Sequence, residues 1–356
     1  MPDRRGLSRV DVDPAPGGGA PATRPRFSPR VHTVSLAARA RAMLRPVVFA
    51  ARRTRQRIGR IVRPPIPWNG VHDPALLRFP PWSGVAGGSF QHDFLGIKTD
   101  GRFRPQVRPD PAGPIETRYP APHGAYFELA FLLDTVYRAA LRPSFTVVEL
   151  GAGYGHWLVV AHHARRRTSG GAIRLVGVEM VERHVVWMRA HFEHNGIDPA
   201  DHRIVHAAVS DRDGIAWYRP EENPWLDYGQ TVVDRAPAKG TVLGSRDLVR
   251  VEALALDRLL RETGSVDLLH ADLQGEEGRA LASAVDALGR HVGRIVCATH
   301  SRRIHRDLRR RFVDAGWRIV DDFRCHRRER TRLGDVQFLD GLLTLVNPGR
   351  ARAEDL

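Results

Sequence analysis

The chain has 356 residues, a formal net charge of +15 and 42% hydrophobic residues. This length can bury a full hydrophobic core, and we expect one large domain with an appendage. The two cysteines form neither a disulfide framework nor a zinc-binding pattern. No apolar run reaches the roughly 18 residues of a membrane-spanning helix. We therefore expect a protein of the reducing cytoplasm.

The positive charge is concentrated at the N-terminal end. Residues 1–65 contain fifteen Arg and three Asp, a charge of +12, which leaves +3 of the total of +15 for residues 66–356. We predict a basic, largely disordered arm over residues 1–65. Within it, residues 34–62 have two interpretations. They form either a basic helix that lies on an anionic membrane or a partner, or a solvated leader.

The next part of the chain is predicted to be irregular. Residues 66–120 are rich in Pro and Gly and carry scattered aromatic residues. This composition predicts an irregular N-terminal subdomain or cap. Apolar residues then recur at helical spacing over 123–141, which predicts a helix in front of the first strand of the main domain.

From residue 145 onward, short apolar runs alternate with helical patterns. This alternation predicts a doubly wound α/β fold, a mostly parallel sheet covered by helices on both faces. The last two strands have no helix between them, so we expect an antiparallel hairpin at one edge. The domain should span 121–349, with a tail at 350–356. The expected strands are 145–150, 173–178, 203–209, 248–254, 266–271, 293–299, 317–323 and 336–346. The expected helices are 155–167, 181–195, 256–263, 276–289 and 302–315. Residues 217–247 are expected to be irregular.

The most informative motif is FTVVELGAGYG at residues 145–155. A buried strand ends in Glu149 and turns through glycines into a helix, and the next strand ends in Glu179. Strand, Gly-rich turn, helix, strand and terminal acid together indicate a nucleoside-binding βαβ unit. The glycines that should let the backbone approach the nucleoside are Gly151, Gly153 and Gly155. An ordinary tight turn is the alternative interpretation of the same residues.

The glycine spacing also indicates which nucleoside is bound. A dinucleotide fingerprint needs its third glycine three residues after the second, and that position is His156 here. A GxGxG turn after an acidic strand end is instead the arrangement of S-adenosylmethionine (SAM) methyltransferases. The motif therefore favours SAM over NAD.

Several separate stretches resemble the FkbM family of SAM-dependent methyltransferases. They include HAAVSDRDG (206–214), VEALALDRLL (251–260), VDLLHADLQGEE (266–277), THS (299–301) and LLTLVNP (342–348), in addition to ELGAGYG. The resemblance covers roughly residues 120–349. It implies a Rossmann-like sheet, SAM as methyl donor and O-methylation of sugar or natural-product hydroxyls. The family usually carries Lys where this chain has His270.

Each part of SAM has an expected partner in the βαβ unit. Glu149 should face the positively charged end of SAM, or else be a buried acid bonded to the turn. Glu179 should bind the ribose hydroxyls. The N-terminus of the helix, at 153–156, should offer free N–H groups to the carboxylate. The small side chains of Ala207 and Ala208 should leave room for adenine, although packing alone would also explain them.

The expected catalytic groups lie at strand ends, where parallel α/β sheets place their ligands. Methyl transfer to an alcohol needs the acceptor oxygen in line with the methyl group and benefits from a base. Asp272 and His300 are the first candidates for base or acceptor binding, and His270 is the third. The alternative role of Asp272 is a helix N-cap, and that of His300 is a surface imidazole.

Two further features remain open in the sequence. Asp272 and Glu277 are acidic enough for a divalent metal, but no tight ligand spacing stands out, so the sequence leaves a divalent metal open and assigns no metal ligands. Aromatic residues gather in the irregular stretch, where they form either a sugar-stacking wall or ordinary loop packing. They are Trp217, Tyr218, Trp225 and Tyr228.

The sequence thus predicts a SAM-dependent O-methyltransferase with a small-molecule acceptor, a carbohydrate or a secondary metabolite. One alternative is an NAD-dependent oxidoreductase on a similar fold. The other is a basic nucleic-acid-binding protein or RNA methylase driven by the arm. No recognisable RNA-binding module accompanies the arm, so we expect no specific nucleic-acid partner.

Overall fold

The computed structural model describes residues 64–350, except residues 105, 169, 222, 224–226 and 234–247. The predictions of a disordered arm and of a membrane-associated helix at 34–62 lie outside these residues, as does most of the predicted tail. Among the described residues, no helix is both long and apolar enough to cross a membrane.

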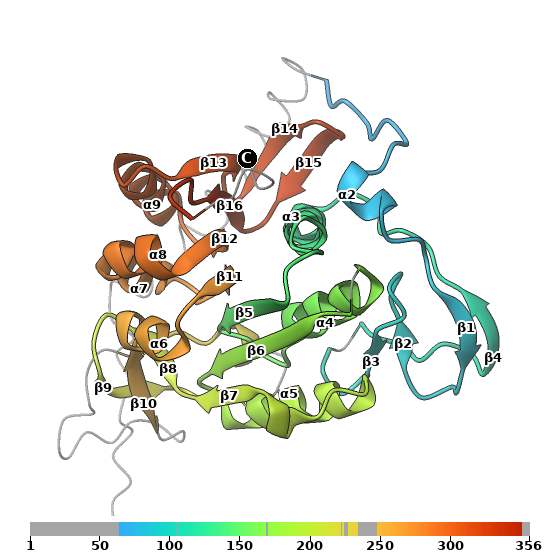
Figure 1. The fold of residues 1–356 in the computed structure, drawn as a ribbon, viewed down its shortest axis with the longest axis horizontal. Coiled ribbons are helices and arrows are strands. Elements are labelled where there is room, and N and C mark those ends of the chain that lie inside the picture. Colours follow the sequence, from blue (N-terminus) through green and yellow to red (C-terminus); the bar gives the residue numbers. More distant parts are fainter. Residues whose placement is uncertain are drawn as a thin grey trace, which may run out of the picture. The chain divides into compact units, whose positions relative to one another are not determined.

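The main sheet has seven strands in the order β13-β16-β12-β11-β5-β6-β7 (Figure 1). Neighbouring strands are parallel, except that β16 runs antiparallel to both β12 and β13. The expectation of a mostly parallel sheet with an antiparallel pair near one edge is therefore confirmed. The strands are β5 (Ser144–Leu150), β6 (Ala172–Glu179), β7 (Arg203–His206), β11 (Val266–Ala271), β12 (Val292–Thr299), β13 (Arg318–Phe323) and β16 (Gly341–Val346).

Side chains alternate between the two faces of this sheet, and each face has its own hydrophobic core. Val147 and Leu268 belong to one core, whereas their neighbours Val148 and Leu269 belong to the other. Helices from both sides complete these cores, as the near-continuous apolar strands require. The first face is covered by α3 (Gly124–Arg138), α4 (His156–Thr168) and α5 (Glu182–His194), and the second by α6 (Leu256–Thr263), α7 (Glu277–Ser283), α8 (Val285–His291) and α9 (Arg302–Asp314).

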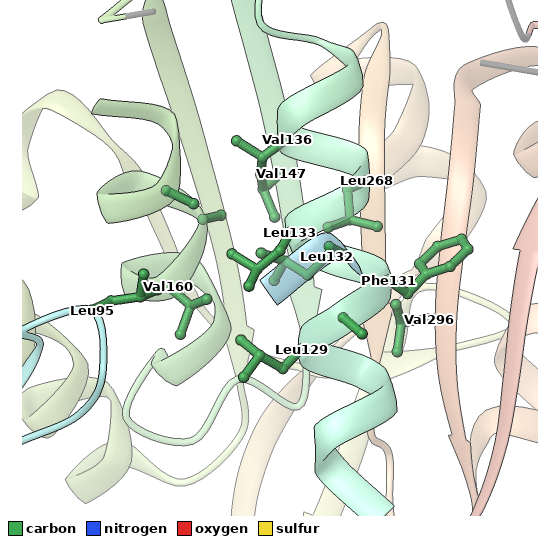
Figure 2. Close-up of a cluster of buried hydrophobic side chains, with 14 of the residues drawn as sticks. Leu95, Leu129, Phe131, Leu132, Leu133, Val136, Val147, Val160, Leu268 and Val296 are labelled. Carbon is green, nitrogen blue, oxygen red and sulfur yellow. The ribbon is translucent and has the colours of Figure 1, made fainter. Parts of the chain in front are cut away.

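Helix α3 illustrates how the sequence pattern selects the buried face. Leu129, Leu132, Leu133 and Val136 recur at helical spacing, and all are at least nine-tenths buried. They lie among Val147, Leu268 and Val296 of three neighbouring strands (Figure 2). The helix therefore lies across the centre of the sheet, and this position brings its polar residue Glu128 close to the end of β11.

The predicted strand 203–209 is in fact two strands that belong to different sheets. β7 ends at His206, and β8 (Ala208–Ser210) joins β10 (Val249–Ala255) and β9 (Gly214–Tyr218) in a separate three-stranded sheet. Between them, the Ala207 N–H donates to the Glu179 carbonyl oxygen at 3.0 Å. An unbroken apolar run does not reveal such a change of sheet. The irregular stretch predicted from residue 217 onward also begins within a strand, β9.

Two other predicted elements are divided. The expected helix 276–289 is broken at Ala284, whose φ of −108° and ψ of 14° depart from helical values. The expected strand 336–346 is broken before Gly341. Its first part is β15 (Gly334–Phe338), which pairs with β14 (Arg327–Thr331) in a hairpin outside the main sheet.

The region before α3 has little regular structure, as its composition predicts. It contains the short helix α2 (Pro74–Leu77) and two small antiparallel pairs, β1 (Ser83–Ala86) with β4 (Gly113–Glu116) and β2 (Gln91–His92) with β3 (Lys98–Thr99). The Asn195 side chain, at the end of α5, binds both the N–H and the carbonyl oxygen of Lys98. These bonds fix the segment that follows β3 beside α5.

Candidate functional site

A cavity opens at the carboxyl ends of β5, β6 and β11, the edge where parallel α/β sheets bind ligands. Its volume is about 900 Å³ when the open mouth is included. Most of the predicted site residues line it together. These are Glu149, Gly151, Gly153, Glu179, Ala207, Ala208, His270 and Asp272.

The three glycines of the turn all have positive φ values, between 54° and 74°. A Cβ atom on any of the three would also come within 3.0 Å of a neighbouring atom. A Cβ atom on Gly151 would lie 2.0 Å from the Asp272 carbonyl oxygen, and one on Gly155 would lie 2.7 Å from Met188 Cγ. Gly155 does not line the cavity, so its contact is with α5. Gly151 lets the turn pass directly beside the end of β11.

Glu179 organises the turn through its carboxylate. Its Oε2 accepts the Gly153 N–H and its Oε1 accepts the Val181 N–H, both at 2.8 Å. The residue is only 6% exposed yet lines the cavity. Each carboxylate oxygen keeps a further acceptor position for a ribose hydroxyl. The Gly153 N–H is therefore not free for a ligand carboxylate, contrary to expectation.

Glu149 is a buried acid at the end of β5 that faces the cavity and also bonds to the backbone. Its Oε2 accepts the Leu158 N–H of α4 at 3.2 Å. Burial raises the pKa of Glu149 to about 8, against the opposing influence of His270. At neutral pH the group is therefore largely a neutral acid that can both donate and accept hydrogen bonds.

Ala207 and Ala208, the residues expected beside adenine, are both buried and line the cavity. The nearby acids Asp211 and Asp213 do not line the cavity. The Ser210 hydroxyl donates to Asp211, and Asp213 accepts the Ala255 N–H at 2.9 Å. These bonds are typical of turn residues.

The aromatic residues of the insertion separate into two groups. Tyr218 is buried in the core of the three-stranded sheet, whereas Tyr228 lines the cavity. Tyr228 stacks on His184 with ring centroids 4.2 Å apart, and its hydroxyl donates to the Phe103 carbonyl oxygen at 2.9 Å. Trp225 lies outside the described residues. The sequence did not predict that the segment around Phe103 would reach this cavity.

The other end of the cavity carries His270, which is 2% exposed. Its Nε2 lies 2.8 Å from Glu128 Oε2, and its Nδ1 is buried without a hydrogen-bond partner among the described residues. Burial lowers the pKa of His270, but the Glu128 hydrogen bond and charge outweigh burial and raise it. Sequence reasoning missed Glu128, which lies 142 residues away on another element.

Asp272 lies beside His270 at the cavity wall, with 39% of its side chain exposed. Its Oδ1 accepts a hydrogen bond from the Gln274 amide at 2.7 Å. Desolvation by the surrounding protein raises the pKa of Asp272 to about 6, although His300 and His270 oppose this. The alternative role as a helix N-cap is wrong, because Glu276 occupies the N-cap position of α7.

His300 lies behind Asp272 and does not itself line the cavity. Its Nδ1 is 2.7 Å from Oε1 of the fully buried Glu277, and its Nε2 is 3.4 Å from Asp272 Oδ1. Burial lowers the pKa of His300, but Glu277 and then Asp272 outweigh it and raise the pKa to about 9. His300 is therefore a paired, largely buried cation rather than a surface imidazole.

Asp272, Glu277 and His300 each offer one ligand atom within 4.8 Å of the others, a spacing that could hold a metal ion. The sequence did not predict this proximity. The Glu277 carboxylate is already occupied by protein donors, however. Its Oε1 accepts the N–H groups of Leu273 and Gly275 at 2.9 and 3.1 Å, in addition to His300. These hydrogen bonds account for the cluster without an ion.

The strand order and the position of the cavity define a class I methyltransferase-like α/β fold. No family model matches the chain. The chain is 28% identical over 240 residues to a protein named "Putative methyltransferase" from Jannaschia sp. (strain CCS1). The match covers 65% of this chain and 82% of that protein.

Solved structures with some similarity include methyltransferase FkbM from Methylobacillus flagellatus KT. It has a TM-score of 0.38 and 13% identity, over 63% of this chain and 55% of that chain. An O-methyltransferase from Bacillus cereus in complex with SAH has a TM-score of 0.34 and 15% identity, over 64% of this chain and 83% of that chain. TM-scores below 0.5 permit no conclusion about acceptor or chemistry.

Proposed function

We propose that the protein is a SAM-dependent O-methyltransferase that acts on a hydroxyl group of a small molecule, a carbohydrate or a secondary metabolite. One observation carries the proposal. The acid-and-glycine turn expected for SAM shares a single cavity with Asp272 and His270, which are suited to bind and deprotonate an alcohol. When bound, SAM supplies a methyl group activated by its sulfonium.

The residues present fit such a ligand. Glu179 has acceptor positions for the ribose hydroxyls, and the buried alanines after β7 leave space for a flat base. Glu149 lies between these alanines and His270. In the register of β5 and β11, Glu149 is directly opposite His270. The ribose and the reacting end can therefore be held by neighbouring strands, which favours an in-line geometry.

Asp272 is the base in this proposal. With a pKa of about 6, it is mostly ionised at neutral pH and a stronger proton acceptor than an ordinary aspartate. His300, held by Glu277, stabilises its negative charge from behind. His270, held by Glu128, orients the acceptor oxygen beside it. Transfer to a neutral amine would need less help from a base, so this arrangement favours a hydroxyl.

The competing functions have less support. His156 takes the position of the third glycine that an NAD-binding turn requires, which disfavours an oxidoreductase. A nucleic-acid methylase would draw its affinity from the basic residues 1–65, which lie outside the described residues. The proposal places the enzyme in the cytoplasm, with residues 34–62 in contact with an anionic membrane surface.

Titration calorimetry with SAM, S-adenosylhomocysteine (SAH) and NAD tests the cofactor. We expect binding of SAM and SAH but not of NAD. A screen of hydroxyl-bearing acceptors with SAM labelled in its methyl group then tests the transfer. Binding of NAD without SAM would overturn the methyltransferase assignment, and label found only on nitrogen would overturn O-methylation.

A further inference from the structure

Arg104 is the only Arg or Lys among the described residues that line the cavity. The same wall carries four carboxyl groups, those of Glu149, Glu179, Asp272 and Glu276. SAM has a sulfonium and an ammonium, which suit acids, but it also has one carboxylate, which needs a cation or free N–H groups. The acids of the cavity can match the two positive groups of SAM, but they leave its carboxylate without a partner.

Arg104 lies at the end of the cavity where the Gly-rich turn enters α4. Its guanidinium carbon is 5.5 Å from the centroid of the Tyr154 ring. Its charge also acts on His156 and Tyr228, which line the cavity beside it. No ion pair joins Arg104 to an acid in the part of the chain that the structure describes. Its guanidinium donors are therefore directed to no protein carboxylate.

The backbone before Arg104 is held in place from two sides. Phe103 is fully buried, and its ring lies 5.2 Å from that of Tyr154. Its carbonyl oxygen accepts the Tyr228 hydroxyl at 2.9 Å. Arg104 is therefore carried by an anchored segment, although its own side chain extends to the surface of the cavity.

Two of the N–H groups at 153–156 that were expected to bind the ligand carboxylate, those of Gly153 and Gly155, are already used within the protein, as is that of Leu158 in the first turn of α4. That of Gly153 donates to Glu179 at 2.8 Å, that of Gly155 donates to the Ala152 carbonyl oxygen at 2.7 Å, and that of Leu158 donates to Glu149 at 3.2 Å. A planar guanidinium binds a carboxylate through two parallel hydrogen bonds and can therefore take the place of these backbone N–H groups.

We propose that Arg104 binds the carboxylate of the amino-acid end of SAM, so that the irregular region before α3 completes the cofactor site. This inference rests on the proposed function and assigns a specific role to a residue outside the motifs shared with methyltransferases. It also explains why Tyr228, from the insertion after β9, anchors this segment over the Gly-rich turn.

The test compares two ligands that differ in the part that Arg104 contacts. SAH has the amino-acid end, whereas 5′-methylthioadenosine has the same nucleoside without it. In titration calorimetry, Arg104→Ala should weaken SAH binding about tenfold or more, the scale of a lost charge-assisted bond, and leave methylthioadenosine binding unchanged. Arg104→Glu should weaken SAH further, and Arg104→Lys should retain part of the affinity.

Arg102→Ala is the matched control. Arg102 is two residues away, 66% exposed at its side chain and paired with Asp100, and it does not line the cavity. Its replacement should leave both affinities unchanged. Equal losses for SAH and methylthioadenosine in Arg104→Ala, or no loss for either, would overturn the role of Arg104. A wild-type protein that binds neither ligand would instead overturn the proposed function and, with it, this inference.

Discussion

The two halves of the cavity are built by different kinds of hydrogen bond. In the half that we propose for the cofactor (the cofactor half), Glu149 and Glu179 accept backbone N–H groups from residues between 2 and 26 positions away. In the half that we propose for the acceptor (the acceptor half), side chains pair with side chains from separate elements. His270 pairs with Glu128, 142 residues away, and His300 pairs with Glu277, 23 residues away.

This difference determines what a substitution should do. An acid that accepts buried backbone N–H groups is part of the turn, and its loss leaves donors without partners at a cost to stability. A paired side chain such as Asp272 can be changed with little effect on the backbone. We therefore expect substitutions in the cofactor half to change affinity and stability together, and substitutions of Asp272 to change turnover alone.

The largest effect is expected for Asp272→Asn. This change keeps the size of the side chain but removes its ability to accept a proton, so turnover should fall by about 10²-fold or more. SAM affinity, measured by calorimetry, should stay nearly constant. In the wild type, kcat/KM should rise with pH through about 6, because Asp272 must be ionised to act as the base.

Near-normal turnover in Asp272→Asn, together with a lower melting temperature, would make the residue structural. The base would then be His270, and Glu128→Gln provides the decisive comparison. This change removes the charge that raises the pKa of His270. A downward shift of the kcat/KM profile along the pH axis when Glu128→Gln is added to Asp272→Asn would identify His270 as the titrating group, because in the wild type the Glu128 charge also raises the pKa of Asp272.

The next effect is a loss of affinity in the cofactor half. Glu179→Ala should weaken SAM binding about tenfold or more, since a hydrogen bond to a charged group contributes about 1.5–3 kcal/mol. It should also lower the melting temperature, because the N–H groups of Gly153 and Val181 lose their acceptor. Unchanged SAM affinity with lowered stability would assign Glu179 to the turn alone.

The same contrast explains how much the sequence could predict. The cofactor half could be predicted from residues that are close in the sequence. These are an acid at a strand end, glycines that the turn requires, and a second acid at the next strand end. Alternating apolar runs likewise predicted the order of the main elements, and α6 has the predicted bounds. These features depend on residues that are near each other in the chain.

The rest depends on distant contacts that no local pattern encodes. Glu128 is one polar residue in an apolar helix, and only the position of α3 on the sheet brings it to His270. Arg104 lies in an irregular region without periodicity. The change of sheet at Ala207 falls within one predicted strand and the break at Ala284 falls within one predicted helix, and no local signal marks either. In each case, the local sequence is compatible with more than one structure, and packing against distant parts of the chain determines which one forms.

A smaller effect is expected for Gly155→Ala, which separates packing from ligand contact within the turn. Gly155 has a φ of 74°, and an added Cβ would lie 2.7 Å from Met188 Cγ. The left-handed backbone alone should cost about 1–2 kcal/mol of unfolding free energy, measurable by urea denaturation. SAM affinity should change less than in Glu179→Ala, because Gly155 does not line the cavity. An equal loss of affinity would place Gly155 in the binding site itself.

The smallest effect concerns His300 and the pH dependence of stability. Its pKa is about 9 in the folded protein and near 6.5 without its partners, because Glu277, Asp272 and Asp340 face the imidazole and outweigh its burial. A raised pKa means that the pair stabilises the fold fully below about pH 6.5 and that this stabilisation is lost as pH rises through about 9. The melting temperature of the wild type should therefore fall more steeply between pH 7 and pH 10 than that of His300→Gln, with calorimetric scans as the measurement. Parallel curves would mean that His300 is neutral in the folded protein, and Asp272 would then have no cation behind it to stabilise its charge.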